Sequence, residues 1–246
     1  MFKSFFDGIA AYGRAFSLVS ELRLWGYVIA PGILSLLLGA GIIWVAIGVA
    51  DDIGGWLLSW YPWEWGRAVI EKIANVFGGL LVATLGLIIF KNLVIALASP
   101  IMSPLSEKVE RYLTGKPAIP FNLSQFASDL MRGIRISIRL IVRELFFTMM
   151  LLLIGLIPLL SPFVAIAIFI VQAYYAGAGN IDFALERHFR VRESVRFVRQ
   201  HRLLAIGNGV VYVLLLLTGI GFLVALPLGV VAATVETVKR LSAQPK

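Results

Sequence analysis

Long apolar runs separated by short charged stretches dominate the chain and predict helices that cross a membrane. The uncharged run from Gly26 to Ala50 has 25 residues, which is long enough for a helix to span a bilayer with some tilt. A second run, Ile73 to Phe90, continues past Lys91 to Ala98. We expect Lys91 to extend its ammonium group toward the membrane surface. These two runs predict two full transmembrane helices.

The apolar stretch at residues 145–177 is interrupted by Pro158 and Pro162, with 13 uncharged residues on each side. A helix rises about 1.5 Å per residue, so each arm would reach roughly 20 Å against about 30 Å of hydrocarbon. Arginine-rich sequence before and after the stretch indicates that both flanks are cytoplasmic. The pattern therefore predicts a re-entrant hairpin. Residues 203–235 repeat the plan, with two apolar arms joined by TGIG.

The segments between the apolar runs are predicted to lie at the membrane surfaces. Residues 51–66 hold four tryptophans and three acids and no base, which indicates an interfacial loop on the outer side. Pro100 and Pro104 are expected to break or kink the helix that precedes them. We expect one membrane domain with both termini in the cytoplasm, composed of an amphipathic surface helix at 1–25, spans at 26–50 and 67–98, and hairpins at 145–177 and 203–235.

Composition agrees with this all-α membrane interpretation, because 59% of the residues are hydrophobic and only 15% are charged. Soluble domains carry about a quarter charged residues. The chain has no cysteine, and His188 and His201 both lie in arginine-rich sequence, so we expect no metal site and no cofactor. The net charge is +8, but the basic residues flank apolar segments. That arrangement is typical of contact with anionic membrane lipids and argues against nucleic acid as a partner.

Two groups of arginines recur at intervals that place each group along one face of a helix. One interpretation is a positively charged cytoplasmic face that touches lipid phosphates. The other is a cationic funnel that attracts an oxyanion to a pore mouth. The two groups are Arg132, Arg135, Arg139 and Arg143, and Arg192, Arg196, Arg199 and Arg202.

The predicted hairpins favour a permeation pathway, because re-entrant segments bring helix ends and backbone to mid-membrane depth. A non-transporting structural or regulatory membrane protein, whose hairpins bend the bilayer or bind a partner, is the alternative. An enzyme is disfavoured, since the sequence contains no recognisable nucleophile–base pair, phosphate loop or metal-ligand spacing.

Several short motifs occur in order along the chain: ASPIMSPLSEKVE, RELFF, YYAGAGNIDFALERHF, SVRFVRQHRLLAIGNG and PLGVVAAT. Together they resemble the CysZ sulfate-permease family, which includes etoposide-induced-protein-like membrane proteins. The resemblance extends from about Phe5 to Arg240. It implies two long spans plus two hemi-penetrating hairpins, assembly as a homo-oligomer in the cell inner membrane, and entry of sulfate or sulfite that feeds cysteine synthesis.

The resemblance also implies two groups of site residues. The family binds sulfate at a Gly-Leu-Arg motif just before the first span, through backbone N–H groups and arginine. Here Leu22 and Arg23 match that motif, and Glu21 stands in place of the glycine. The family's charged core after the second span resembles Glu107, Glu110 and Arg111 in this chain, which we expect to line a pore or to form a charged network.

Overall fold

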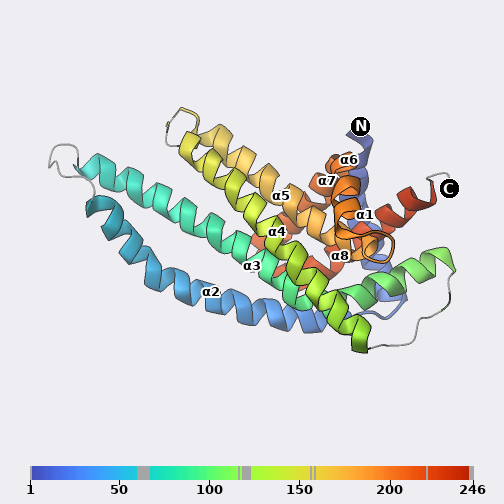
Figure 1. Ribbon diagram of the computed structural model, residues 1–246. Coiled ribbons are helices and arrows are strands. Elements are labelled where there is room, and N and C mark those ends of the chain that lie inside the picture. Colours follow the sequence, from blue (N-terminus) through green and yellow to red (C-terminus); the bar gives the residue numbers. More distant parts are fainter. Residues whose placement is uncertain are drawn as a thin grey trace.

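The computed structural model describes residues 2–59, 67–115, 117, 123–155, 157, 159–219 and 221–243, and all regular structure in these ranges is helical. The all-α prediction is therefore confirmed for this part of the chain. Figure 1 shows the long helices side by side. Their bounds are α1 Phe2–Glu21, α2 Gly26–Ser59, α3 Arg67–Thr114, α4 Leu123–Gly155, α5 Ser161–Leu185, α6 Val191–Gln200, α7 Arg202–Leu217 and α8 Phe222–Ser242.

Four segments of these helices are long and apolar enough to cross a membrane: Gly26–Val45, Val82–Thr114, Ser161–Leu185 and Phe222–Ser242. A fifth candidate consists of α6 and α7 together, which meet at an angle of 89°. The chain is thus a helical membrane protein. The depth that each hairpin reaches in the bilayer stays a prediction.

Both predicted full spans belong to helices that are longer than the sequence pattern indicated. Residues 51–59, expected to be part of an interfacial loop, are instead the end of α2. That part of the prediction is wrong, because no proline occurs there to interrupt the helix. Residues 60–66 of the expected loop lie outside the described residues. In α3, the helix continues through Pro100 and Pro104 and changes direction near them, so the prolines kink the helix and do not end it (Figure 1).

The first predicted hairpin corresponds to α4 and α5, and its arms are longer than expected. The arginine-bearing segment and the first apolar arm are one continuous helix, α4. The second arm, α5, has 25 residues, or roughly 37 Å of helix, so the expected reach of about 20 Å is wrong for this arm. The helix continues to Leu185 because the small and amide residues that follow Tyr175 are buried in the bundle.

The second predicted hairpin, α7 and α8, ends partway along the α2–α3 pair. The ring of Phe222, at the start of α8, lies 6.3 Å from the ring of Phe90 between their centroids. Between Arg67 and Phe90, roughly 35 Å of α3 extends beyond that level. A hairpin that stops short of the full spans is what a re-entrant segment requires.

Helices α5 and α7 touch through their backbones. A Cβ atom at Gly209 would lie 1.7 Å from the carbonyl oxygen of Ala173, and one at Gly177 would lie 1.9 Å from that of Ala205. Each helix therefore presents two small residues four positions apart, which is the pattern that lets membrane helices approach closely. The close contact fixes the two hairpins against each other.

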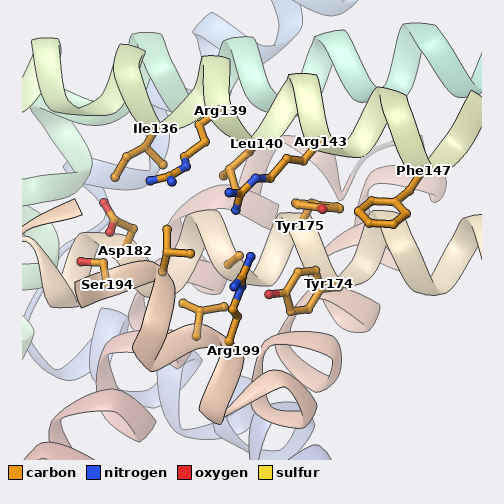
Figure 2. Close-up of a pocket in the computed structure, with 13 residues that line it drawn as sticks. Ile136, Arg139, Leu140, Arg143, Phe147, Tyr174, Tyr175, Asp182, Ser194 and Arg199 are labelled. Carbon is orange, nitrogen blue, oxygen red and sulfur yellow. The ribbon is translucent and has the colours of Figure 1, made fainter. Parts of the chain in front are cut away.

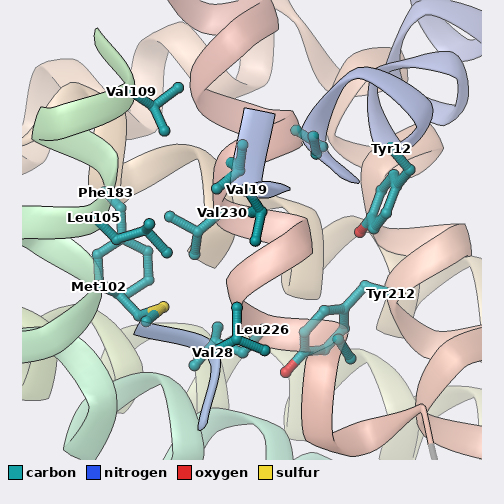
Figure 3. Packing of buried hydrophobic residues seen from close by; sticks show 14 of the residues in the cluster. Tyr12, Val19, Val28, Met102, Leu105, Val109, Phe183, Tyr212, Leu226 and Val230 are labelled. Atoms are coloured by element: carbon teal, nitrogen blue, oxygen red, sulfur yellow. The ribbon is translucent and has the colours of Figure 1, made fainter. Parts of the chain in front are cut away.

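The main hydrophobic core joins α1 to the two hairpins and to the kinked part of α3. Figure 3 shows Val19 of α1 next to Val230 of α8, and the same cluster contains Tyr12 of α1 and Leu226 of α8. The hydroxyl of Tyr12 donates a hydrogen bond to the carbonyl oxygen of Asn208, at 2.9 Å. One face of α1 is therefore held inside the protein. Phe2, Phe6 and Phe16 of the same helix are exposed, as a helix at the membrane surface requires.

A cysteine placed at Leu160, between α4 and α5, tests the predicted depth of the first hairpin in a chain that has no cysteine of its own. We expect Leu160→Cys to react slowly with bulky, impermeant thiol reagents added on either side of the membrane. Lys239→Cys, at a side chain that is 70% exposed, is the reactive control. Labelling of Leu160→Cys from the periplasmic side at the rate of an exposed loop would contradict the re-entrant hairpin. The matching position in the second hairpin, Ile220, lies outside the described residues.

Candidate functional site

The turn between α1 and α2 carries Leu22 and Arg23, the residues that match the family motif. The N–H of Leu24 donates to the carbonyl oxygen of Val19 at 2.8 Å, and the N–H of Arg23 donates to that of Ser20 at 3.2 Å. These two bonds form a Schellman motif, which requires a left-handed residue and normally uses glycine. Arg23 occupies that position with a φ of 52°. An L-residue pays about 1–2 kcal/mol for this conformation, so Arg23 is locally strained.

The side chain of Arg23 is exposed, and among the described residues it has no hydrogen-bond or ion-pair partner. The backbone N–H groups of Trp25 and Gly26, at the start of α2, likewise have no backbone partner in the part of the chain that the structure describes. Glu21 lines a cavity of about 330 Å³ together with Arg14 and other residues, and Arg23 does not line it. An arginine and free N–H donors that belong to the same turn at a helix N-terminus can together hold an anion.

The three charged residues expected after the second span divide into two groups. Glu107 and Arg111 form an ion pair one helical turn apart, with Nε and Oε1 3.6 Å apart, and both side chains are partly exposed. Glu110 points away from them toward α5. The structure therefore brings two of the three together and gives the third different partners.

Glu110 belongs to a buried network that joins α3 to the end of α5. Its carboxylate accepts hydrogen bonds from Arg187 at 2.9 and 3.0 Å and contacts Nε2 of His188 at 2.9 Å. Arg187 also donates to the hydroxyl of Ser106 at 2.9 Å. That hydroxyl lies 2.8 Å from the Oγ1 atom of Thr234 on α8. Arg187 and His188 were not identified as site residues from the sequence, because nothing in the spacing along the chain relates them to Glu110.

A second charged cluster joins α4, α5 and α6. The guanidinium of Arg132 donates to both carboxylate oxygens of Asp182, at 3.0 and 3.3 Å. It also donates to the hydroxyl of Ser194 and to the carbonyl oxygen of Phe189, each at 3.0 Å. A bidentate pair of this kind fixes the orientation of both groups. Of the first arginine group, Arg132 thus serves packing between helices and is not free to meet an anion.

Lys91 does not extend toward the membrane surface as the sequence predicted. Its side chain is fully buried and forms an ion pair with Glu144 of α4, which is fully buried as well. The ammonium group also donates to the carbonyl oxygen of Gln172, at 3.1 Å, and Glu144 accepts a further bond from Asn92 at 3.2 Å. The prediction failed because α4 supplies a carboxylate next to Lys91, which makes the route to water unnecessary.

Buried polar atoms that have no hydrogen-bond partner among the described residues also lie on α4, α5 and α7. The hydroxyl groups of Thr148 and Tyr212 and the Oε1 atom of Gln172 are buried and have no hydrogen-bond partner among the described residues. Charged residues inside a membrane span are costly, and they commonly mark a pathway for an ion or a proton. Within the described residues, no group of three or more histidine, cysteine or acidic side chains is arranged to hold a metal ion.

Because Glu107 and Glu110 have different partners, Glu107→Gln and Glu110→Gln should have different effects on stability. Glu107 and Arg111 form a partly exposed pair, so Glu107→Gln should lower the free energy of unfolding by only about 0.3–0.5 kcal/mol. Glu110→Gln removes the charge that Arg187 and His188 face, and should cost about 1–2 kcal/mol. Thermal unfolding of the two purified variants in detergent gives the comparison. Equal losses of unfolding free energy in the two variants would contradict the assignment of Glu107 and Glu110 to different groups.

The model of the family described as Sulfate transporter CysZ/Etoposide-induced protein 2.4 matches residues 11–227 of the chain. The match includes the α1–α2 turn, the charged turn of α3, the first hairpin, the second hairpin as far as Pro227, and the buried Lys91–Glu144 pair. It extends over most of the sequence. The chain therefore belongs to this family, as the order of its motifs indicated.

Proposed function

We propose that this member of the CysZ/Etoposide-induced protein 2.4 family is a permease for sulfate or a related oxyanion such as sulfite. It would act in the cell inner membrane as a homo-oligomer, with both termini in the cytoplasm, and supply sulfur for cysteine synthesis. The family of the chain and its membrane helices support transport as the general activity. Sulfate as the substrate comes from the family's description and from the chemistry of the α1–α2 turn.

The observation that carries the proposal is the conformation of Arg23. An arginine in the left-handed region is unfavourable, and glycine would remove the strain at this position of a Schellman motif. Strained residues that persist commonly do so because the strained conformation is used. Here the side chain of Arg23 is exposed and has no partner among the described residues, and the same turn carries the N–H groups of Trp25 and Gly26, which have no backbone partner there. A tetrahedral oxyanion can accept hydrogen bonds from both kinds of donor.

The route beyond this turn would use the buried charged residues. We propose that the group of Glu107, Glu110 and Arg111 lines a pore or a central polar network between protomers. Lys91 and Glu144 lie inside the helical bundle, where a desolvated anion would need charged and polar groups. Such buried charges are expected along an ion pathway and have no use in a simple membrane anchor.

A structural or regulatory membrane protein with the same fold is the second candidate, and one observation favours it. Arg187, Arg132 and Arg240 all form ion pairs that join different helices, so part of the positive charge serves to hold the bundle together. A purely structural protein would gain nothing from a free, strained Arg23. It would also show no saturable movement of sulfate.

Uptake of radiolabelled sulfate by liposomes that contain the purified protein tests the proposed function and its substrate. Unlabelled sulfate and sulfite should reduce uptake, because both are oxyanions that accept several hydrogen bonds. Chloride at the same ionic strength should not, because it is a single spherical ion that offers no separate oxygen acceptors. Competition by chloride equal to that by sulfate would rule out oxyanion selectivity.

A further inference from the structure

A cleft of about 360 Å³ lies between α4, α5 and α6. Figure 2 shows Arg139 and Arg143 entering it from α4 and Arg199 entering it from α6, with the guanidinium groups of Arg143 and Arg199 directed toward each other. Tyr174, from α5, turns its hydroxyl group toward Arg199 in the same view. None of the lining residues comes from α1 or α2.

The cleft has an excess of positive charge that the described residues do not neutralise. Arg139, Arg143 and Arg199 have no hydrogen-bond or ion-pair partner in the part of the chain that the structure describes. The acid that lines the cleft is Asp182, whose two oxygens both accept from Arg132. Like charges that face each other across a small space repel. An anion between them would replace that repulsion by attraction.

We propose that this cleft binds a tetrahedral oxyanion, sulfate or phosphate, between Arg143 and Arg199, with Arg139 as a third cation. The fork of N–H donors on each guanidinium can contact two oxygens of such an ion at once. The hydroxyl of Tyr174 adds a donor at the wall. The apolar residues Leu140 and Val198 exclude water from the floor, which strengthens each charged contact.

The oxyanion has two sources with the same chemistry. It can be a free ion from the aqueous phase, collected on the way to the translocation route, or the phosphate of an anionic lipid headgroup. The cleft is a separate site from the α1–α2 turn. This inference rests on the proposed function for its ligand class. Reaction of a cysteine inside the cleft measures binding there independently of transport.

A cysteine at Val195, which lines the cleft and is half-buried, reports on occupancy in the otherwise cysteine-free chain. Its rate of reaction with a small neutral thiol reagent is measured in lipid-free detergent during a titration with sodium sulfate, with sodium chloride at matched ionic strength as reference. The same rate is measured in nanodiscs of phosphatidylcholine with and without phosphatidylglycerol. If Val195→Cys does not fold, Phe147→Cys on the opposite wall gives the same measurement.

Two double variants are compared in this background. Arg143→Gln/Arg199→Gln removes the two facing guanidinium groups. The control Arg135→Gln/Arg196→Gln removes the same charge from the same two helices, at exposed residues that do not line the cleft. We expect sulfate to slow the reaction of the cysteine. Arg143→Gln/Arg199→Gln, the cleft variant, should need a sulfate concentration at least about tenfold higher for the same protection. The control variant should need the same concentration as the parent.

Protection by sulfate in detergent identifies a free oxyanion as the ligand, whereas protection that arises from phosphatidylglycerol without sulfate identifies a lipid phosphate. A rate that neither sulfate nor phosphatidylglycerol changes would overturn the proposal. So would an equal shift in the cleft and control variants, because general attraction by positive charge would then explain it. If sulfate does not protect Val195→Cys in a protein that still takes up sulfate, only the cleft site is contradicted. If sulfate protects the cysteine but the protein does not transport sulfate, only the proposed function is contradicted.

Discussion

In Lys91→Met, the free energy of unfolding should fall by about 3–5 kcal/mol, because Glu144 would remain fully buried without its counter-charge. Asn92 would be the one remaining side-chain donor that the structure places on that carboxylate. The double variant Lys91→Met/Glu144→Leu should recover most of the loss, since two apolar side chains of similar volume can replace a buried ion pair at little cost. Thermal or denaturant unfolding of the purified proteins measures both values.

Lys239→Met is the matched control for this substitution, because Lys239 is 70% exposed and its pair with Glu236, at 3.7 Å, lies at the protein surface. Its effect should be a few tenths of a kcal/mol. If Lys91→Met/Glu144→Leu were as unstable as Lys91→Met, the loss could not come from the unpaired carboxylate of Glu144, and the interpretation of the buried ion pair would be wrong. Sulfate uptake by the double variant adds a second result: recovered stability without recovered uptake would assign the pair to the transport route.

Arg23→Lys should weaken sulfate binding by about ten- to a hundredfold, the loss of one charge-assisted contact worth roughly 1.5–3 kcal/mol. Lysine keeps the positive charge and, as an L-residue, keeps the strained backbone at a φ of 52°. It cannot offer two parallel donors to a tetrahedral ion. Titration calorimetry with sulfate measures the change, and Arg14→Lys, at another exposed cation of the same region, is the control.

Arg23→Gly completes the comparison. Glycine adopts the left-handed conformation freely, so this variant should unfold at a higher temperature than the native protein and bind sulfate less well. Higher stability together with weaker binding is what a strained binding residue predicts. Native affinity in Arg23→Lys would instead leave Arg23 as an interfacial anchor.

The helical architecture could be predicted from the sequence because hydropathy alone separates membrane helices from the rest. Helix ends were predicted less well. α2 continues through Asp51 and Asp52 to Ser59, since two acids do not end a helix that lacks a proline. α4 contains both an arginine-bearing segment and an apolar arm, because helix propensity is similar in both and only their surroundings differ.

The contacts between distant helices could not be predicted from one sequence. Lys91 and Glu144 are 53 residues apart, and their pairing depends on how α3 and α4 are rotated about their axes. Spacing within one helix contains no such information. For the same reason two interpretations of the arginines stayed open. Only the folded arrangement separates Arg132, which is paired, from Arg143 and Arg199, which have no partner among the described residues.

Sulfate counterflow in proteoliposomes tests the central claim, oxyanion permeation, most directly. Vesicles that contain the purified protein and a high concentration of unlabelled sulfate are diluted into a trace of labelled sulfate. If the protein carries sulfate, the label should accumulate transiently above its equilibrium level, and unlabelled sulfate added outside should abolish the effect. Label that enters no faster than it enters protein-free vesicles, with the protein still folded and monodisperse, would contradict the account.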